Sequence, residues 1–270
     1  MKVAGKTVAV TGGGNGIGRE LVLNLLGRGA RVAALDLSEA GLKETVELAG
    51  DAADRLSTHV VDITDREAVE TLPAAIVAAH GQVDGVINCA GIIQPFVRLK
   101  DLDYAAIERV MNVNFWGLTY VTKTFLPHLL ERPVAHIVNV SSMGGFLPVP
   151  GQTMYGASKA AVKLLTEGLH SELTGTPVAV TVVFPGAIAT EISKNSGLDM
   201  PARSADDGQK SSFKALPAPE AARIIVDAME KDAFRVTVGK DATTMDRLAR
   251  LAPRRAAAMI AKKMKDLLPA

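Results

Sequence analysis

The stretch YGASK, residues 155–159, places a phenol and an ammonium group four residues apart. Because positions i and i+4 lie on one face of a helix, Tyr155 and Lys159 would share an environment if this stretch is helical. The other two tyrosines, Tyr104 and Tyr120, have no cation four residues further along the chain. A phenol with a pKa of about 10 becomes a useful base near neutrality only when a positive charge stabilises the phenolate. The pair therefore predicts a proton-transfer site in which Lys159 lowers the pKa of Tyr155.

A second stretch, TGGGNGIG at residues 11–18, has the composition of a phosphate-binding turn. Gly12, Gly16 and Gly18 fall where a short apolar strand runs into a helical pattern. Backbone amides can approach a phosphate closely where no Cβ intervenes, and the following helix presents its positive N-terminus. The stretch predicts a site for the pyrophosphate of a dinucleotide.

Asp36 ends the next β-branched segment, eighteen residues after Gly18. This is close to the distance at which a carboxylate binds the adenosine ribose of a dinucleotide. A carboxylate there repels a 2′-phosphate, and the following residue is Leu37 rather than a neutralising arginine. The pattern favours NAD(H) over NADP(H) as the cofactor.

The elements that would position these residues alternate along the chain. Short β-branched segments predict seven strands, at 7–11, 31–36, 56–62, 83–88, 135–141, 178–184 and 234–239. Helical periodicity predicts helices at 16–27, 39–49, 66–80, 154–173 and 219–231, with a long pair over 105–130. Such alternation is typical of an α/β fold, a doubly wound sheet of seven mainly parallel strands with helices on both faces. Ligands of such sheets bind at the carboxyl ends of the strands.

Two segments interrupt this alternation. Residues 193–216 are polar and long for a loop, which predicts a lid over the substrate. Residues 240–270 carry eight Lys or Arg and three Asp, and their apolar residues recur at helical spacing. We expect two short helices broken before Pro253, packed over the body or a neighbouring subunit; a membrane-surface helix is the less favoured alternative. The predicted division is a catalytic domain over 1–239 and a helical C-terminal extension over 240–270.

Composition excludes several other classes of protein. The formal net charge of +1 gives no field for nucleic acid, and the single cysteine, Cys89, cannot form an intrachain disulfide. The five histidines lack ligand spacing, so no metal site is predicted. The N-terminus lacks the apolar region of a signal peptide, so we expect a cytoplasmic protein.

Taken together, TGGGNGIG, Asp36, NCAG at 88–91, NVN at 112–114, SS at 141–142 and YGASK resemble the motifs of the classical short-chain dehydrogenase/reductase family. The resemblance implies a Rossmann-type NAD-binding fold with Tyr155 as acid and base. It also implies that Ser142 binds the substrate oxygen, that Lys159 additionally binds the nicotinamide ribose, and that Asn114 holds a water in a proton relay. A homo-oligomer, a tetramer or a dimer, is implied in the same way.

The resemblance further implies a set of cofactor contacts. Ile17 would join the three glycines around the pyrophosphate, and Asp62 would contact the adenine. The wall after the fourth strand would contain Asn88, chiefly a support of the sheet, with Ala90 and Gly91. The nicotinamide would be lined by residues 185–188, including Pro185, Gly186 and Ile188, with Thr190 on its amide.

The segments expected to border the substrate, residues 92–99 and 143–154, are mainly apolar. We therefore predict a lipophilic secondary alcohol or ketone as substrate. The alternative hypothesis is a non-catalytic nucleotide-binding or scaffold protein on the same fold. The complete Ser142, Tyr155 and Lys159 set argues against it, since a non-catalytic relative could lose any of the three.

Overall fold

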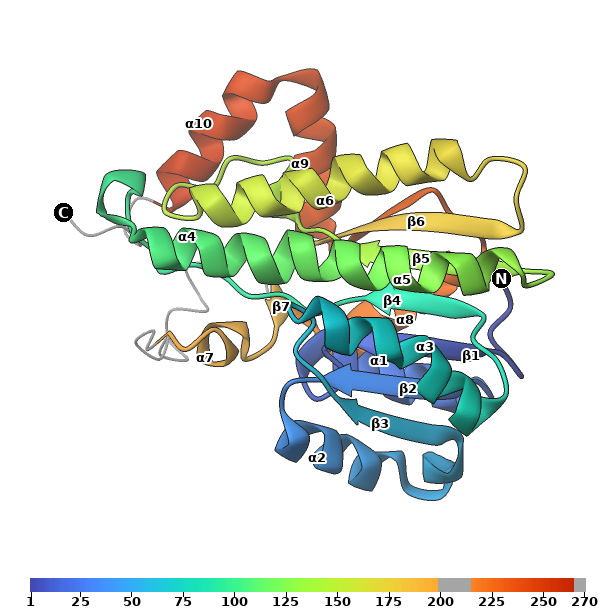
Figure 1. Ribbon diagram of the computed structural model, residues 1–270. Helices are drawn as coiled ribbons and strands as arrows, with labels where there is room; N and C mark the ends of the chain where they lie inside the picture. Colours follow the sequence, from blue (N-terminus) through green and yellow to red (C-terminus); the bar gives the residue numbers. More distant parts are fainter. Residues whose placement is uncertain (199–214, 265–270) are drawn as a thin grey trace.

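The computed structural model of the chain describes residues 1–198 and 215–264. Seven parallel strands form one sheet in the order β3-β2-β1-β4-β5-β6-β9 (Figure 1). The strands are β1 (Thr7–Thr11), β2 (Arg31–Asp36), β3 (Leu56–Val60), β4 (Gly85–Asn88), β5 (Ala135–Val140), β6 (Val178–Pro185) and β9 (Arg235–Val238). The predicted doubly wound sheet is confirmed. Its strand order reverses between β1 and β4, which is where such sheets bind their ligands.

Helices cover both faces of this sheet (Figure 1). One face is covered by α1 (Gly16–Gly27), α2 (Glu39–Ala49) and α8 (Ala218–Glu230). The other face is covered by α3 (Arg66–His80), α5 (Leu118–Leu130) and α6 (Thr153–Glu172). Strand β1 shows why both faces must be covered: Val8 and Val10 enter the first core and Ala9 enters the second, since successive side chains point to opposite faces.

The long helical stretch before β5 contains an irregular turn. Helix α4 (Tyr104–Met111) continues through a π-helical segment, Asn112–Gly117, into α5. The sequence analysis predicted a pair of helices here and did not predict this segment. A π-helical turn re-aims the side chains it carries, and such turns are frequent at functional sites. Asn114 lies within it.

Some predicted boundaries were wrong. The third strand ends at Val60 rather than Asp62, because the Asp62 carboxylate accepts hydrogen bonds from the backbone N–H and hydroxyl of Thr64 (2.8 and 2.7 Å) and turns the chain away. The fourth strand begins two residues later than predicted. The chain also forms a short strand pair that was not predicted, β7 (Ile188–Ala189) with β8 (Leu216–Pro217). The short helix α7 (Ile192–Asn195) follows β7.

The C-terminal extension forms α9 (Lys240–Leu251) and α10 (Pro253–Lys263). The break falls before Pro253, as predicted. Ala252 leaves helical geometry (φ −145°, ψ 68°), as the residue before a proline tends to do, and Pro253 occupies the first turn of α10. The two helices form a hairpin that projects from one end of the sheet (Figure 1).

Candidate active site

The carboxyl ends of the strands border a cleft of about 1290 Å³. Typical small-ligand pockets measure about 300–1,000 Å³, so this one has room for a dinucleotide and a second molecule. Most of the residues predicted from the sequence lie along it: Gly12, Gly16, Ile17, Gly18, Asp36, Asp62, Ala90, Gly91, Ser142, Tyr155, Lys159, Pro185, Gly186, Ile188 and Thr190. Asn88 and Asn114 do not line the cleft. The tertiary structure therefore brings together residues separated by up to 178 positions.

The glycine-rich turn is held in a conformation that only glycine fits. Gly12 has a φ of +74°, and a Cβ on Gly18 would lie 2.0 Å from the Gly12 carbonyl oxygen. Helix α1 starts directly after this turn, and its N-cap residue, Asn15, makes no side-chain capping bond. The first N–H groups of α1 thus face the cleft without a local acceptor, which is the arrangement that binds phosphate.

Asp36 is ordered beside the same turn. Its Oδ2 accepts from the backbone N–H of Gly14 (2.9 Å) and its Oδ1 accepts from that of Ser38 (2.9 Å). The guanidinium of Arg19 is not free to bind a 2′-phosphate on the ribose, because it already donates to the Gly14 carbonyl and to Glu44 (2.6 Å). The carboxylate lines the cleft with its negative charge available to a ribose.

Two asparagines support the site from outside it. Asn88 donates from Nδ2 to Thr122 Oγ1 (3.0 Å) and Asn139 Oδ1 (2.8 Å), which ties β4 to β5 and α5. Asn114 is fully buried and accepts from Ile92 N (2.9 Å), while its Nδ2 donates to the Ile92 carbonyl (2.9 Å) and to Ser158 Oγ (3.0 Å). Its side chain links the segment after β4 to α6. The water predicted beside Asn114 stays a prediction.

Ser142 and Tyr155 meet at the end of β5. The Ser142 Oγ accepts from Gly144 N (3.0 Å) and is hydrogen-bonded to the Tyr155 phenol. The Ser141 hydroxyl instead donates to the Lys159 carbonyl (2.7 Å) on α6. The hydroxyl of Ser141 is thus tied to α6, and the role of Ser142 at a substrate oxygen stays a prediction.

The expectation that Lys159 lowers the pKa of Tyr155 stays a prediction. Burial raises the pKa of Tyr155, and the hydrogen bond from Ser142 partly opposes this rise. The Lys159 Nζ donates to the Val140 carbonyl (3.0 Å), and burial lowers the pKa of Lys159 itself to about 8. Spacing of four residues placed both groups on one helix face, but it did not set the direction of the flexible lysine side chain.

Cys89 lies in the same cleft, and burial raises the pKa of its thiol to about 12. A thiol is a nucleophile only as its thiolate. Cys89 is therefore protonated at neutral pH and is not a nucleophile there.

The sequence analysis missed a residue beneath the predicted nicotinamide segment. Asp241, in the first turn of α9, is buried and accepts from Ala187 N (2.7 Å). A Cβ on Gly186 would lie 2.3 Å from the Asp241 carboxylate oxygens, so only glycine fits there. The sequence signal for this residue was an acidic side chain shortly after the seventh strand. That signal does not identify its partner, Ala187, which lies 54 residues earlier in the chain.

The C-terminal hairpin forms part of the wall of the cleft. Met245, Ala256 and Ile260 bury against Leu147, with partly buried apolar residues of the segment after Ser142 packed around them. Met264, just after α10, lines the cleft itself. Of the alternatives left open by the sequence, packing over the body is the one that the structure shows.

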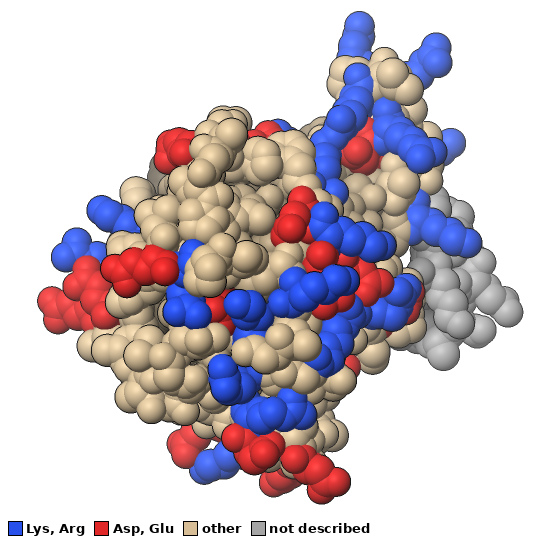
Figure 2. All heavy atoms as spheres, turned by 90° about the vertical axis from the view of Figure 1, so that its right-hand side faces the viewer, with Lys and Arg blue, Asp and Glu red and all other residues tan. Residues whose placement is uncertain are grey.

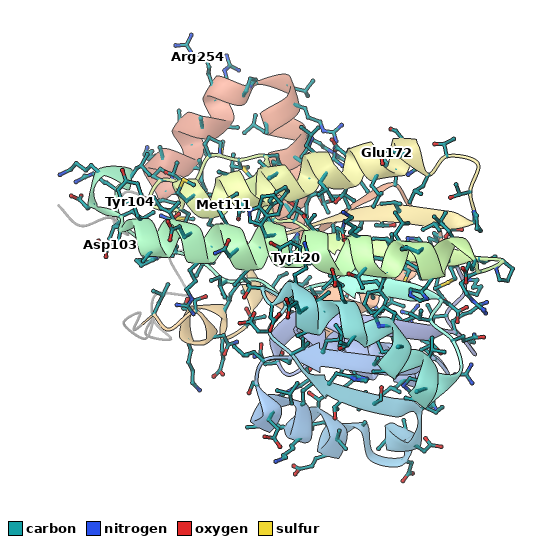
Figure 3. All side chains as sticks on the ribbon, in the orientation of Figure 1. Asp103, Tyr104, Met111, Tyr120, Glu172 and Arg254 are labelled. Atoms are coloured by element: carbon teal, nitrogen blue, oxygen red, sulfur yellow. The ribbon has the colours of Figure 1, made fainter. Side chains whose placement is uncertain are left out.

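Cations cover the outer side of the hairpin. Arg254 points away from the body at its end (Figure 3). Lys and Arg side chains also extend from this projecting part in Figure 2.

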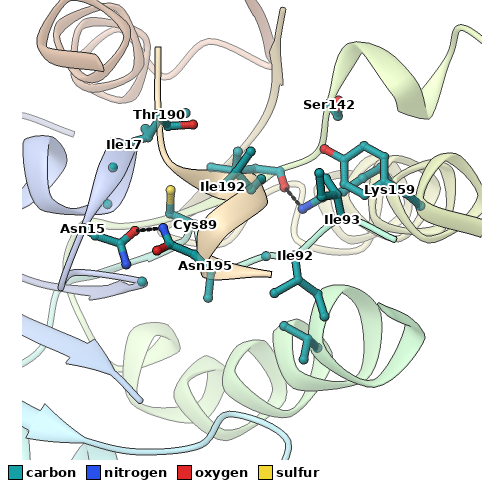
Figure 4. Close-up of a pocket in the computed structure, with 18 of the residues that line it drawn as sticks. Asn15, Ile17, Cys89, Ile92, Ile93, Ser142, Lys159, Thr190, Ile192 and Asn195 are labelled. Atoms are coloured by element: carbon teal, nitrogen blue, oxygen red, sulfur yellow. Dashed lines mark hydrogen bonds between the residues drawn. The ribbon is translucent and has the colours of Figure 1, made fainter. Parts of the chain in front are cut away.

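The first part of the predicted lid, residues 193–198, lies across the cleft, whereas 199–214 fall outside the described residues. Asn195 Nδ2 donates to Asn15 Oδ1 (2.9 Å) in the glycine-rich turn, as Figure 4 shows. Ser196 Oγ accepts from Ile93 N (3.0 Å), and its carbonyl accepts from Arg109 (3.2 Å). The short helix α7 thus joins the cofactor end of the cleft to its opposite wall.

The lowered pKa of Lys159 predicts a pH effect on stability. The folded chain holds the Lys159 proton less tightly than the unfolded chain, with a pKa of about 8 against 10.5. The buried ammonium therefore lowers the free energy of unfolding. This destabilisation is complete below pH 8 and disappears as the pH rises toward 10.5. We expect Lys159→Met, which carries no ammonium, to gain stability over wild type below pH 8 and to lose roughly 3 kcal/mol of that advantage by about pH 10.5.

Urea unfolding of both proteins across this pH range measures the difference. Lys163→Met removes a partly exposed lysine of the same helix, which pairs with Glu167 (2.7 Å), and is the matched control. A difference between Lys159→Met and wild type that does not change with pH would contradict the prediction.

Within the described residues, no helix is long and apolar enough to cross a bilayer, and no group of three or more His, Cys, Asp or Glu could hold a metal ion.

Comparison with known proteins gives a consistent result. The family described as short chain dehydrogenase matches residues 6–201. The putative oxidoreductase SadH of Mycobacterium tuberculosis is 39% identical over 257 residues, covering 92% of this chain and 91% of SadH.

Two crystal structures share the fold. One is a short chain dehydrogenase/reductase from Burkholderia phymatum in complex with NAD, with a TM-score of 0.83 and 26% identity over 93% of this chain and 94% of that one. The other is a short chain dehydrogenase from Burkholderia cenocepacia J2315 in complex with NADP, with a TM-score of 0.77 and 30% identity over 96% and 99% of the two chains. The chain described here belongs to the short chain dehydrogenase family and has its Rossmann-type dinucleotide fold.

Proposed function

We propose that this protein transfers a hydride between NAD(H) and a lipophilic secondary alcohol or ketone. The observation that carries the proposal is that Ser142, Tyr155 and Lys159 line the same cleft as the glycine-rich turn and Asp36. The alternative, a nucleotide-binding scaffold, needs none of these three side chains in the cleft.

The residues of the cleft fit a dinucleotide. The open N-terminus of α1 suits its pyrophosphate, and Gly12 and Gly18 allow the close approach. Asp36 would accept from the adenosine ribose hydroxyls, and its charge favours NAD over NADP; solved relatives bind one or the other. Asp62 would lie at the adenine, and Pro185, Gly186, Ile188 and Thr190 at the nicotinamide. The cofactor supplies or accepts the hydride.

The protein's own part in the reaction is to handle a proton. Ser142 Oγ would donate to the substrate oxygen and hold it beside Tyr155. In the reducing direction, the Tyr155 hydroxyl gives its proton to that oxygen, and in the oxidising direction the phenolate takes it back. Lys159 would bind the nicotinamide ribose. Its ammonium, with the charge of an oxidised nicotinamide, would stabilise the phenolate once its side chain leaves the Val140 carbonyl.

The walls of the cleft support a lipophilic substrate. Ile92, Ile93, Phe96 and Ile192 line it near the catalytic residues, and Met264 adds a further apolar side chain. The nearby Arg109 already donates to the Ser196 carbonyl. An apolar wall favours a bulky hydrocarbon frame over a small charged acid.

A substrate panel tests this proposal. We expect NADH-dependent reduction of menthone, androstanedione or cyclohexanone to exceed that of pyruvate and oxaloacetate by at least about tenfold in kcat/KM, which corresponds to about 1.4 kcal/mol. The loss of NADH absorbance measures each rate. Preference for the two acids would contradict the lipophilic assignment, and NADH binding without turnover of any carbonyl compound would favour the scaffold.

The domain division, assembly and location also remain proposals. Residues 1–239 would form the catalytic domain, with 240–270 as its extension. Exposed apolar residues on the outer helices, Trp116 (46% exposed) and Leu164 (69% exposed), support a homo-oligomer, a tetramer or a dimer. We also propose a cytoplasmic location, which fits the single cysteine of the chain.

A further inference from the structure

Helix α6, which carries Tyr155 and Lys159, begins without a cap of its own. Gln152 occupies the N-cap position but makes no side-chain capping bond. Its Oε1 is buried with no hydrogen-bond partner in the described part of the chain. The first N–H groups of a helix need acceptors when water cannot reach them.

Gln94 supplies those acceptors from a distant segment. Its Oε1 accepts from Met154 N (2.8 Å) and from Tyr155 N (2.9 Å). Gln94 is 1% exposed, so solvent cannot replace it readily. The residue that caps the catalytic helix therefore lies 61 positions before the tyrosine that it contacts.

The remaining polar groups of Gln94 fix its own orientation. Its side-chain Nε2 donates to the Gly151 carbonyl (3.1 Å), and its backbone carbonyl accepts from Gln152 Nε2 (2.7 Å). With the amide held at both ends, Oε1 can face only the start of α6. The two glutamines thus form a closed pair between the segment after β4 and the start of α6.

The same segment is anchored at the two preceding residues. Ile92 is bonded to Asn114 through its N–H and its carbonyl, and Ile93 N donates to Ser196 Oγ. Both isoleucines line the cleft, whereas Gln94 does not. Gln94 is therefore the point at which the cleft wall is joined to the backbone of the catalytic tyrosine.

We infer that Gln94 is a positioning residue that holds the backbone of Tyr155, and hence its phenol, in register with Ser142. The inference rests on the proposed function of Tyr155. A displacement of about 1 Å in a reacting group can cost on the order of a hundredfold in rate. Gln94 touches neither cofactor nor substrate in this role, so its loss should act on kcat rather than on NADH binding.

Three variants test the inference. Gln94→Met keeps the length of the side chain and removes both capping bonds. Gln94→Glu keeps an oxygen acceptor and adds a negative charge beside the backbone of Tyr155. Gln152→Met is the matched control, because it removes the other half of the pair but leaves the N–H groups of Met154 and Tyr155 capped.

We expect Gln94→Met to lower kcat about tenfold to a hundredfold, measured with NADH and the best ketone among menthone, androstanedione and cyclohexanone, with KM for NADH unchanged within about twofold. Gln94→Glu should restore most of kcat and move the pH-rate profile alkaline by about one unit, since the added charge opposes the phenolate. Gln152→Met should leave the profile in place and cost less than about threefold in kcat.

Hydrogen exchange gives a readout that needs no substrate. The amides of Met154 and Tyr155 should exchange about tenfold to a hundredfold faster in Gln94→Met and at nearly the wild-type rate in Gln152→Met. Equal effects of Gln94→Met and Gln152→Met on kcat and exchange, or wild-type kcat in Gln94→Met, would overturn the inference. If Gln94→Met does not fold, Gln94→Ala takes its place, and wild-type kcat in that variant overturns the inference as well.

The two proposals fail separately. Full turnover in Tyr155→Phe removes the acid and base function itself, whatever Gln94 does. Loss of turnover in Tyr155→Phe with full turnover in Gln94→Met removes only the positioning role.

Discussion

Tyr155→Phe should lose between about a hundredfold and ten-thousandfold of kcat, the range that general acid and base catalysis contributes. The variant lacks one oxygen, and that oxygen is the group that meets Ser142. The ring is retained, so its packing near Gly144, where an added Cβ would lie 3.3 Å from the ring, is preserved. We therefore expect NADH binding, measured by fluorescence titration, to stay within about twofold of wild type.

Tyr104→Phe is the matched control, because it makes the same chemical change at a tyrosine that is 82% exposed and outside the cleft. It should retain wild-type turnover. Unchanged turnover in Tyr155→Phe would remove the phenol from the mechanism. Turnover lost together with NADH binding would point to damage at the cofactor site instead of loss of a proton donor.

The second large effect is expected at Asp36. Wild type should use NADH in strong preference to NADPH, and a double variant, Asp36→Ala with Leu37→Arg, should reverse the order. Removing the carboxylate abolishes its repulsion of a 2′-phosphate and its bonds to the ribose, while the new guanidinium can bind the phosphate. Leu37 is 69% exposed and lines the cleft, so the longer side chain has room.

We expect the ratio of kcat/KM for NADH to that for NADPH to change by roughly a hundredfold to a thousandfold. Such a change corresponds to about 3–4 kcal/mol, which two charged hydrogen bonds can supply. Initial rates with both cofactors and one ketone measure it. Asp62→Ala, at the adenine end of the same cleft, is the control, and it should weaken both cofactors alike. A wild-type protein that prefers NADPH would contradict the assignment of Asp36.

Local sequence patterns predicted the framework well, for a physical reason. Strands β1 and β2 and helices α1, α2 and α3 were predicted to the residue, because apolar periodicity and the turns that end each element depend on near neighbours. The turn at Asp62 shows the limit of this reasoning. A side chain that bonds two residues ahead ended the third strand early, although the apolar pattern continued.

The residues of the site were also predictable, since each follows a strand end that a parallel sheet brings to one edge. The direction of their side chains was not. Lys159 lies on the expected helix face, yet its ammonium reaches the Val140 carbonyl, because a buried ammonium needs a hydrogen-bond acceptor and a long side chain can turn toward one.

By itself, the sequence determined the sheet, its cleft and the residues that line it, because those depend on spacing along the chain. Only the tertiary structure decided what holds them in place. Gln94 caps the catalytic helix from 61 residues away, Asp241 binds the backbone beside Gly186, and Met264 brings the C-terminal hairpin to the cleft. No periodic pattern in the sequence links the segments that these contacts join. Buried N–H groups and apolar side chains take whichever partners the packed fold brings within reach.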